Sequence, residues 1–579
     1  MMGFTMLLFD KKRIAIVTLV ALCSVVCSCR AQDVTSLYQS AEIAGISFRV
    51  KKEVRHRIDP RLFGQFMERP SWGEIGVEGG RIPGTHRLQP AVMKLLEDMD
   101  IPVIRFPGGT DVDFMDWRDM VDNVPGRAAQ RPVSTGHRGH KVTNYFGYDE
   151  FLQCCEKLGA EAIVVVNFRD GLLKKKPLKE AAQHAAALVA YCNAPTGTRP
   201  LGAKLLDGMD DWPALRAKNG RAEPYKVKYF QIGNETWAFV RQLKKLMPEA
   251  APEFYTKCLA AYIDAMRSVD PSIQIIVDGH DSNMSGIVPR VREQLKDKID
   301  YFATHFYTPW SITNVARNGK EVPAHEVPAG EIWNAWVAVT WFDANGRSIL
   351  NHPGIDAARR LGYKVAVTEW NWNGRWRVSG PRPALNSSFA KGLGAAGFLH
   401  AFMRSADVID LGCQSMLVGN AWGIHAVWAD AEGRIPPHYM PTGQVTMFYS
   451  KHHGDRLLAL ESQNVPTYEQ PYRMGGIRPS RKVATIDALA TADRQRLYFH
   501  AINRNFDKSM NISIDVSAFD SLEGRAIHHL LEGRLNDAPE QDQPRQIGRI
   551  TQRDIRFDGK TLKVTLPERS VSCIEFNQE

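Results

Sequence analysis

Two glutamates lie at the ends of short apolar runs, where they could act as a pair. Glu235 follows Gly233-Asn234, and Glu369 follows Thr368. Two carboxyl groups can break a glycosidic bond when one protonates the leaving oxygen and the other attacks the anomeric carbon or activates water. The first must keep its proton near neutral pH and the second must stay ionised, so their surroundings must differ. Either glutamate alone would more often be a helix-cap partner or a member of an ion pair, so this chemistry is indicated only by the two together.

The elements that would position this pair are short strands alternating with helices. Helices are predicted over 181–192 and 252–268, for example, because apolar residues recur there at helical spacing. Eight apolar runs predict strands, and they occupy residues 62–67, 103–106, 162–168, 227–232, 273–277, 301–306, 364–368 and 411–417. This alternation predicts an α/β fold, a (β/α)8 TIM barrel.

Polar groups stand at nearly every predicted strand end, which is where the loops of such a barrel converge over its packed interior. Polar groups beside apolar runs are unfavourable unless they have partners, so a ring of them indicates a site. The ring consists of Glu68, Arg105 with Gly108-Gly109, Asn167, Asn234-Glu235, Asp278 with His280, His305 with Tyr307, Glu369 and Gln414.

Several of these residues also have a structural interpretation. His305 could be a satisfied core histidine with Tyr307 packing beside it, and Glu68 could simply pair with Arg105. Asn234-Glu235-Thr236 satisfies a glycosylation sequon, although a strand end inside a barrel is poorly exposed. The tryptophans Trp370, Trp372 and Trp376 could stack on sugar faces or form the hydrophobic clamp of a loop.

The chain changes character after residue 440. Strands separated by polar turns are predicted over 496–502, 510–516, 526–531 and 562–566, which indicates a small antiparallel β-sandwich. Residues 45–54 also resemble a strand, and this strand precedes the barrel. The predicted domains are therefore a catalytic barrel over 58–440 and a β-sandwich built from 45–57 and 441–579.

Composition and charge exclude several classes of protein. Of 579 residues, 44% are hydrophobic and 24% are charged, which is typical of globular proteins. The net charge of +9 is a mild bias, and the basic clusters at 127–138 and 174–176 lack the signature of a nucleic-acid reader, although an acidic polysaccharide partner stays open. Beyond the first thirty residues, six cysteines are scattered without the spacing of a metal site. We expect no cofactor, no metal and no nucleic-acid partner.

The first 31 residues resemble a secretory signal peptide. Lys11-Lys12-Arg13 precedes the apolar stretch 14–26, which is short for a transmembrane helix. Cleavage could follow Ala31, or it could precede Cys29 in a loose lipobox that would leave a lipid anchor at the membrane. Export to the periplasm, the cell surface or the medium is therefore expected. Whether the chain forms a homo-oligomer stays open.

The ordered motifs resemble those of glycoside hydrolase family 51, the α-L-arabinofuranosidases, within a clan of retaining (β/α)8 glycosidases. Gly233-Asn234-Glu235 alone is specific only to the clan, but the set in order is more diagnostic. The matching segments are 63–68 (Phe-Gly-Gln-Phe-Met-Glu), 105–109 (Arg-Phe-Pro-Gly-Gly), 116–118 (Asp-Trp-Arg), 233–235, 305–307 (His-Phe-Tyr), 368–370 (Thr-Glu-Trp) and 566–571 (Leu-Pro-Glu-Arg-Ser-Val).

The resemblance implies a role for each candidate. Glu235 would be the general acid/base and Glu369 the nucleophile of a retaining hydrolysis that removes terminal α-L-arabinofuranosyl residues from a polysaccharide or oligosaccharide. The resemblance also implies substrate-binding roles for Glu68, Asn167, Asn234, Tyr307, Trp117 and Gln414, and we expect His305 and Trp370 to contact the substrate as well.

The sequence departs from the family pattern at two places. Thr110-Asp111 stands where the family has Asn, and a hydroxyl cannot replace both the donor and the acceptor of an amide. The loop with Trp72, Glu74 and Glu78 is also unusual. The same mechanism on another glycan, such as a xyloside or a galactofuranoside, exo or endo, therefore stays open. A second alternative also stays open, a surface lipoprotein that binds glycans without hydrolysing them, although such a protein would not need two catalytic carboxyl groups.

Overall fold

A computed structural model of the chain describes residues 45–121, 133–198, 211–279, 284, 286–338, 353–380, 389–421, 423–520, 522–533 and 546–578. The chain divides into two compact units, Met1–Glu42 and Ile43–Glu579, and all described residues belong to the second unit. The predicted signal peptide (1–31) and His280 lie outside the described residues. Within the described ranges, the helices lack the combined length and apolar character needed to cross a bilayer.

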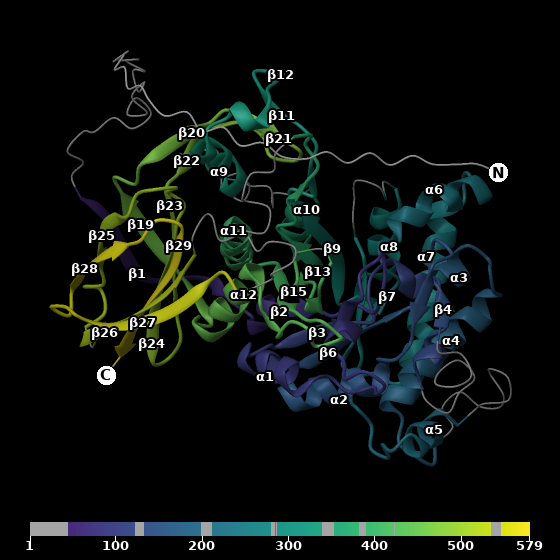
Figure 1. The fold of residues 1–579 in the computed structure, drawn as a ribbon. Coiled ribbons are helices and arrows are strands. Elements are labelled where there is room, and N and C mark those ends of the chain that lie inside the picture. The colour runs from purple at the N-terminus through teal and green to yellow at the C-terminus, as the bar shows by residue number, and fades with distance from the viewer. Residues whose placement is uncertain are drawn as a thin grey trace, which may run out of the picture. The chain divides into compact units, whose positions relative to one another are not determined.

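Eight parallel strands close into a barrel, as the sequence predicts (Figure 1). Around the barrel they follow the order β13-β15-β2-β3-β6-β7-β8-β9. In chain order they are β2 (Gly64–Phe66), β3 (Val103–Phe106), β6 (Glu161–Val166), β7 (Tyr229–Ile232), β8 (Gln274–Asp278), β9 (Tyr301–Tyr307), β13 (Lys364–Asn371) and β15 (Ile409–Ser415). Each predicted run contains or overlaps one of these strands.

Alternating side chains of these strands fill the barrel interior, because successive residues of a strand point to opposite faces. The interior cluster is formed by Phe66, Val103, Ile163, Tyr229, Ile276, Tyr301, Ala303, Ala366, Leu411 and Cys413. Continuing this alternation toward the carboxyl ends of the strands gives the side chains that reach the mouth of the barrel.

At least one helix follows each strand, and eight of these helices alternate with the strands along the chain. The helices are α1 (Pro90–Asp98), α2 (Tyr148–Leu158), α4 (Leu178–Asn193), α7 (Ala251–Val269), α8 (Ile287–Leu295), α10 (Pro353–Leu361), α11 (Ala390–Arg404) and α12 (Pro441–Lys451). The sequence-based boundary after residue 440 assigns α12 to the β-sandwich. The structure corrects this assignment, because α12 packs on α11 and its Thr442 carbonyl accepts a hydrogen bond from Gln414 of β15.

Nine strands form the second domain. They are β1 (Ile46–Arg57), β19 (Arg456–Gln463), β23 (Ile486–Ala492), β24 (Arg496–Asn503), β25 (Met510–Asp515), β26 (Leu522–Glu532), β27 (Arg549–Arg556), β28 (Thr561–Leu566) and β29 (Ser570–Gln578). One apolar core gathers residues from both ends of this sheet, from β28 to β26, so the sheet folds over on itself as a sandwich. Figure 1 shows β1, in purple, among the green and yellow strands of the C-terminal part, where it pairs with β19 and, in parallel, with β25.

A buried charged cluster joins the barrel to the sandwich. Asp487 of β23 pairs with Arg404, the last residue of α11, and with Arg504, whose Nη2 lies 2.9 Å from Asp487 Oδ2. Arg504 is almost wholly buried. Burial alone would raise the pKa of Asp487, but the charges of Arg404, His400 and Arg504 hold it well below its ordinary value. This carboxylate is therefore ionised and matched by two guanidinium groups.

Candidate active site

The two predicted catalytic glutamates meet at the mouth of the barrel. Glu235 lies three residues beyond the end of β7, and Glu369 lies in β13. One carboxylate oxygen of Glu235, one of Glu369 and a ring nitrogen of His305 all lie within 4.8 Å of one another. Carboxyl groups about 5–5.5 Å apart are typical of retaining glycosidases, whereas inverting enzymes hold theirs about 6.5–9.5 Å apart. The nearest oxygens of the two carboxyl groups are close enough for both groups to reach one anomeric centre.

An irregularity in β13 aims Glu369 into the barrel. Ala366 points inward, so strict alternation would bring Thr368 and Trp370 inward as well. The pairing of β13 with β9 shifts between Val367 and Glu369, as at a β-bulge. The shift turns Glu369 inward and leaves Thr368 Oγ1 3.0 Å from His305 Nε2.

The surroundings of Glu369 favour its ionised form. Arg105 Nη1 donates to Oε1 at 2.8 Å, and the Tyr307 hydroxyl donates to Oε2 at 2.8 Å. Burial alone would raise the pKa of Glu369, but His305, Arg105 and the hydrogen bond from Tyr307 outweigh it and lower the pKa. A carboxylate that stays ionised in a buried site can act as a nucleophile.

Glu235 has a more open position. Its side chain is 28% exposed, and Oε1 lies 3.0 Å from His305 Nδ1. Burial of His305 would lower the pKa of its ring, but Glu369 and Glu235 raise it overall. Glu235 has φ +48°, a conformation that costs free energy for a non-glycine residue and is frequent at functional sites. A carboxyl that faces both solvent and the nucleophile suits proton transfer to and from a leaving group.

Arg105, which is fully buried, orders the floor of the site. Its Nε donates to Gln231 Oε1 at 2.8 Å and its Nη2 donates to Asn234 Oδ1, in addition to the bond to Glu369. Asp113 stabilises the same region, because its carboxylate accepts hydrogen bonds from the backbone N–H groups of Phe168, Arg169 and Asn234. Burial raises the pKa of Asp113 to about 6 despite these bonds. Sequence reasoning did not single out Asp113 or Gln231.

Glu68 is buried beside the nucleophile. Its pKa is raised well above the ordinary value by burial and by the nearby charges of Glu369 and Asp111. Gly108 and Gly109 enclose it, because a Cβ at Gly108 would lie 2.9 Å from Glu68 Cγ and one at Gly109 would collide with Oε1. Across the described ranges Arg105 pairs with Glu369 and not with Glu68, so the simple ion-pair interpretation of Glu68 is wrong.

Two family models match the segments that carry these residues. The model described as "Alpha-L-arabinofuranosidase 1 domain" matches residues 95–318, and the model described as "Alpha-L-arabinofuranosidase C-terminal domain" matches residues 368–570. The chain belongs to the α-L-arabinofuranosidases of glycoside hydrolase family 51. The first match contains Arg105 and Glu235, and the second contains Glu369 and the sandwich.

Individual relatives agree with this family. A "Probable alpha-L-arabinofuranosidase C" of Aspergillus niger is 28% identical over 374 residues, which are 62% of this chain and 65% of the relative, slightly less than two thirds of its length. An "Intracellular exo-alpha-(1->5)-L-arabinofuranosidase" of Halalkalibacterium halodurans is 24% identical over 90% of this chain and 97% of the relative. The crystal structure of the α-L-arabinofuranosidase from Thermotoga maritima, an arabinose complex, covers 92% of this chain and 100% of that chain with a TM-score of 0.66 and 23% identity, which shows the shared fold.

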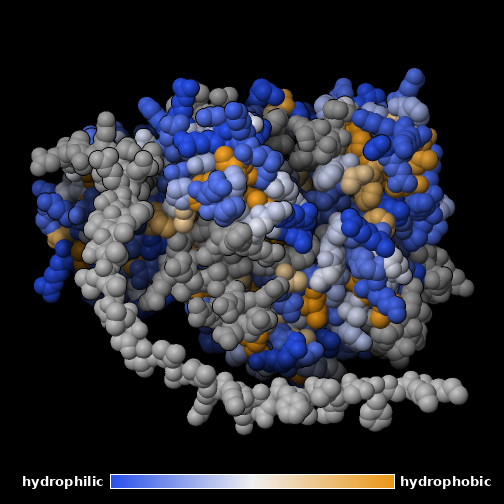
Figure 2. Space-filling model, turned by 45° about the horizontal axis from the view of Figure 1, so that its top comes forward, coloured by the Kyte–Doolittle hydropathy of each residue, from blue (hydrophilic) through white to orange (hydrophobic). Residues whose placement is uncertain are grey.

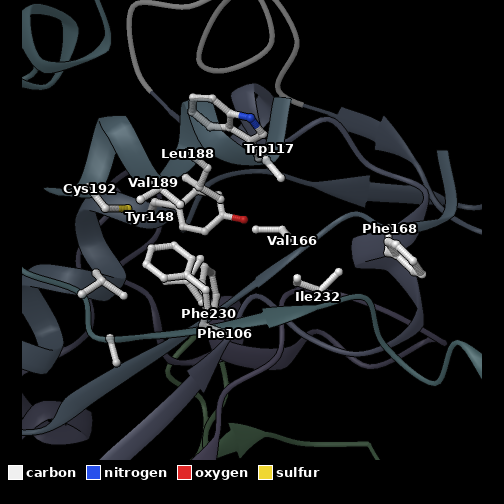
Figure 3. Packing of buried hydrophobic residues seen from close by; sticks show 14 of the residues in the cluster. Phe106, Trp117, Tyr148, Val166, Phe168, Leu188, Val189, Cys192, Phe230 and Ile232 are labelled. Carbon is white, nitrogen blue, oxygen red and sulfur yellow. The ribbon is translucent and has the colours of Figure 1, made fainter. Parts of the chain in front are cut away.

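Two tryptophans are predicted to contact the sugar, Trp117 from the family resemblance and Trp370 from the interpretation that it stacks on sugar faces, and both lie elsewhere. Trp117 is 5% exposed, packs on Trp212 and donates from Nε1 to the His184 carbonyl. Figure 3 shows Trp117 among the packed side chains around Leu188 of α4. Trp370 points outward from β13 and packs on Phe402 of α11. Both predictions of sugar contact are corrected, because these rings belong to the layer between strands and helices.

The other predicted tryptophans form a clamp. Trp372 and Trp376 are buried, and both stack on Trp336, with ring centroids 4.7 and 5.7 Å apart. Of the two interpretations of this group, the structure supports the hydrophobic clamp. This clamp fixes the segment that follows Glu369.

The predicted contact of Gln414 with the substrate is also corrected. It points outward from β15, where Nε2 donates to the Thr442 carbonyl and Oε1 accepts from Thr446 at 2.7 Å. The next residue, Ser415, reaches the mouth instead, with Oγ 2.7 Å from the Tyr307 hydroxyl oxygen. Strict alternation from Leu411 and Cys413 would have identified Ser415. Asn167 lies just beyond β6. Its side-chain amide donates a hydrogen bond to the Met115 carbonyl and accepts one from the backbone N–H of Asp170.

The two segments that depart from the family pattern, Thr110-Asp111 and the loop around Trp72, are in contact through Asp111. It accepts hydrogen bonds from Ser71 Oγ at 2.7 Å and from the backbone N–H of His137 at 2.7 Å. The His140 ring lies 3.2 Å from Asp111 Oδ2. Trp72 packs on His137, so the unusual first loop and the hairpin of residues 133–143 form one wall next to Glu68. Sequence reasoning noted both loops but could not show that they touch.

Proposed function

We propose that the chain is a retaining exo-glycosidase that releases terminal α-L-arabinofuranosyl residues from a polysaccharide or oligosaccharide. The observation that carries the proposal is the approach of Glu235 and Glu369 to within 4.8 Å in a chain of family 51. Relatives with that activity in their names support the choice of sugar.

The geometry gives each group a step in a double displacement. Glu369, ionised and oriented by Arg105 and Tyr307, attacks the anomeric carbon while Glu235 donates its proton to the leaving oxygen. Glu235 then takes a proton from water, which attacks the same carbon and releases Glu369. Asn234, held by Arg105 and by Asp113, presents its amide to the bound sugar.

Aryl glycosides of different sugars test the proposal. The proposal expects fast release of the aryl group from the α-L-arabinofuranoside. Activity only on a xyloside or a galactofuranoside would overturn the choice of sugar, and the wall around Asp111 would be the place to look for the cause. In Glu235→Gln, kcat/KM, which reports the first displacement, should fall less for an activated aryl group than for a sugar leaving group, because a good leaving group needs no acid, whereas the sugar loses about 10²–10⁴-fold. Equal losses would contradict the acid role.

We also propose that the chain is exported, with cleavage either before Cys29, which then carries a lipid anchor, or after Ala31. The basic residues 11–13 and the apolar stretch 14–26 support export. Fractionation of cells that make the full chain, with Cys29→Ser as the matched variant, tests both points. Membrane association that is lost in the variant is expected for the anchor, and an uncleaved protein in the cytoplasm would overturn export.

A further inference from the structure

We infer that α6 (Trp237–Leu246) forms a binding site for an acidic, uronate-bearing polysaccharide main chain, from which the arabinofuranosyl branch is removed. This inference rests on the proposed function and adds the class of substrate. It starts from the position of the helix. α6 begins two residues after Glu235, at the carboxyl end of β7.

The position of Glu235 decides which part of the substrate α6 would meet. In a retaining glycosidase the acid lies on the side of the leaving group and the nucleophile lies on the opposite side of the sugar. The leaving oxygen belongs to the main chain when a branch is removed. The main chain must therefore extend from the Glu235 side of the mouth, where α6 is the next element along the chain.

α6 borders an open hollow of suitable size for one or two sugar units. The hollow has a volume of about 520 Å³. Its lining residues are Trp237, Ala238, Val240, Arg241, Lys244 and Lys245. Trp237 is half-buried at the end nearest Glu235, and indole rings pack well on the apolar faces of sugars. Figure 2 shows hydrophilic and hydrophobic residues interspersed over one face of the molecule.

The charged side chains that line this hollow are all positive. Arg241, Lys244 and Lys245 are exposed, and α6 contains no acidic residue. Within the part of the chain that the structure describes, none of the three cations forms an ion pair, whereas Arg221 pairs with Glu156 and Lys298 pairs with Asp264. The dipole at a helix end explains lysines in the last turn, but it does not explain Arg241.

The spacing of the three cations favours a polyanion. Positions i, i+3 and i+4 share one face of a helix, where like charges repel each other. An anionic ligand that spans this face removes the repulsion. Carboxylates carried at intervals along a polysaccharide fit both requirements of the hollow, a sugar ring beside Trp237 and negative charge beside Arg241, Lys244 and Lys245. The mild positive charge of the whole chain has the same sign.

The test compares one polymer in two forms. An arabinofuranosyl-substituted glucuronoxylan is used as isolated and after chemical reduction of its uronate carboxyls to alcohols, which leaves the branches intact. With the acidic form we expect a KM about tenfold lower at low salt, and a difference that disappears as salt rises. In R241Q/K244Q/K245Q the difference should vanish through KM, with kcat unchanged and aryl arabinofuranoside hydrolysis unaffected.

The matched control is R481Q/K482Q/K563Q, which removes three exposed cations, two on β22 (Ser480–Ala484) and one on β28, none of which forms an ion pair with a described residue. It changes the net charge by the same amount and should keep the preference for the acidic polymer. Equal KM for the two polymers in the natural protein, or loss of the preference in both variants, would overturn the inference. Failure to hydrolyse any arabinofuranoside would instead overturn the proposed function. Binding of uronate oligosaccharides to Glu369→Ala, measured by calorimetry, would then still show whether α6 holds an acidic glycan.

Discussion

Two buried charged clusters of this molecule use the same residue types with opposite balance. At the junction of barrel and sandwich, one carboxylate, Asp487, is matched by Arg404 and Arg504. At the mouth of the barrel, one buried guanidinium, Arg105, faces the carboxyls of Glu369, Glu68 and, further out, Glu235. The junction is compensated, whereas the mouth carries more acid than base.

The difference separates a structural cluster from a reactive one. The charges of Arg404, His400 and Arg504 hold the pKa of Asp487 well below its ordinary value, so this carboxylate stays ionised. At the mouth, burial and mutual repulsion push the pKa of Glu68 up while Arg105, His305 and Tyr307 push that of Glu369 down. Neighbouring carboxyls with divergent pKa values are typical of catalytic sites. The comparison therefore predicts loss of activity from changes at the mouth and loss of stability from changes at the junction.

The largest effect is expected for Glu369→Ala. Loss of the nucleophile should lower the hydrolysis rate by about four orders of magnitude or more. Azide should restore turnover by attacking the anomeric carbon in place of the carboxylate, and NMR should show a glycosyl azide of inverted configuration. Glu369→Gln, which keeps the shape of the side chain beside Arg105, is the matched control and should be as inactive without rescue. A variant that retains a few per cent of the rate would contradict the assignment.

The next effect is expected at the junction. Asp487→Asn leaves Arg504 buried without its counter-charge and should lower the free energy of unfolding by about 3–5 kcal/mol. Denaturant unfolding measures this value, and kcat per folded molecule should stay unchanged. Asp515→Asn removes the partner of the exposed Arg49 and should leave stability nearly unchanged. If Asp487→Asn lowered kcat while leaving stability intact, the contrast between the two clusters would fail.

The smallest effect is expected for Tyr307→Phe. The hydroxyl of Tyr307 helps to lower the pKa of Glu369, so its removal should raise that pKa. The acidic limb of the pH profile of kcat/KM should move to higher pH, and the rate at the optimum should fall by about tenfold, as expected for one charge-assisted hydrogen bond. Ser415→Ala removes the other partner of the hydroxyl and leaves its bond to Glu369 in place. It should move the acidic limb less than Tyr307→Phe does, and the opposite ranking would contradict the role of Tyr307.

The sequence was a good guide to the strands and a poorer guide to the direction of side chains. Barrel strands are buried on both faces, so they appear as apolar runs with polar ends, and every predicted run overlaps a strand. The direction of a side chain depends on the alternation of residues within its strand, and a shift of one residue reverses that direction. Gln414 and Ser415 differ by one position, and only Ser415 reaches the mouth.

The contacts that complete the site could not be read from the sequence. Arg105 and Gln231 are 126 positions apart, and Asp113 and Asn234 are 121 apart. The residue types around Thr368 also do not predict the irregularity of β13, because this irregularity depends on the pairing of β13 with β9. Family motifs mark strand ends, and the structure brings the two carboxylates that they contain together at one mouth. The predicted sugar contacts of Trp117 and Trp370 fail because this chain uses both rings for packing.

The most direct test of the catalytic pair is the anomeric configuration of the first product. An aryl α-L-arabinofuranoside is hydrolysed in the NMR tube and spectra are taken before the free sugar mutarotates. Two carboxyl groups this close leave no room for a water molecule behind the sugar, so α-L-arabinofuranose should appear first. If β-L-arabinofuranose appeared first, water would have attacked directly, and Glu369 could not be the nucleophile.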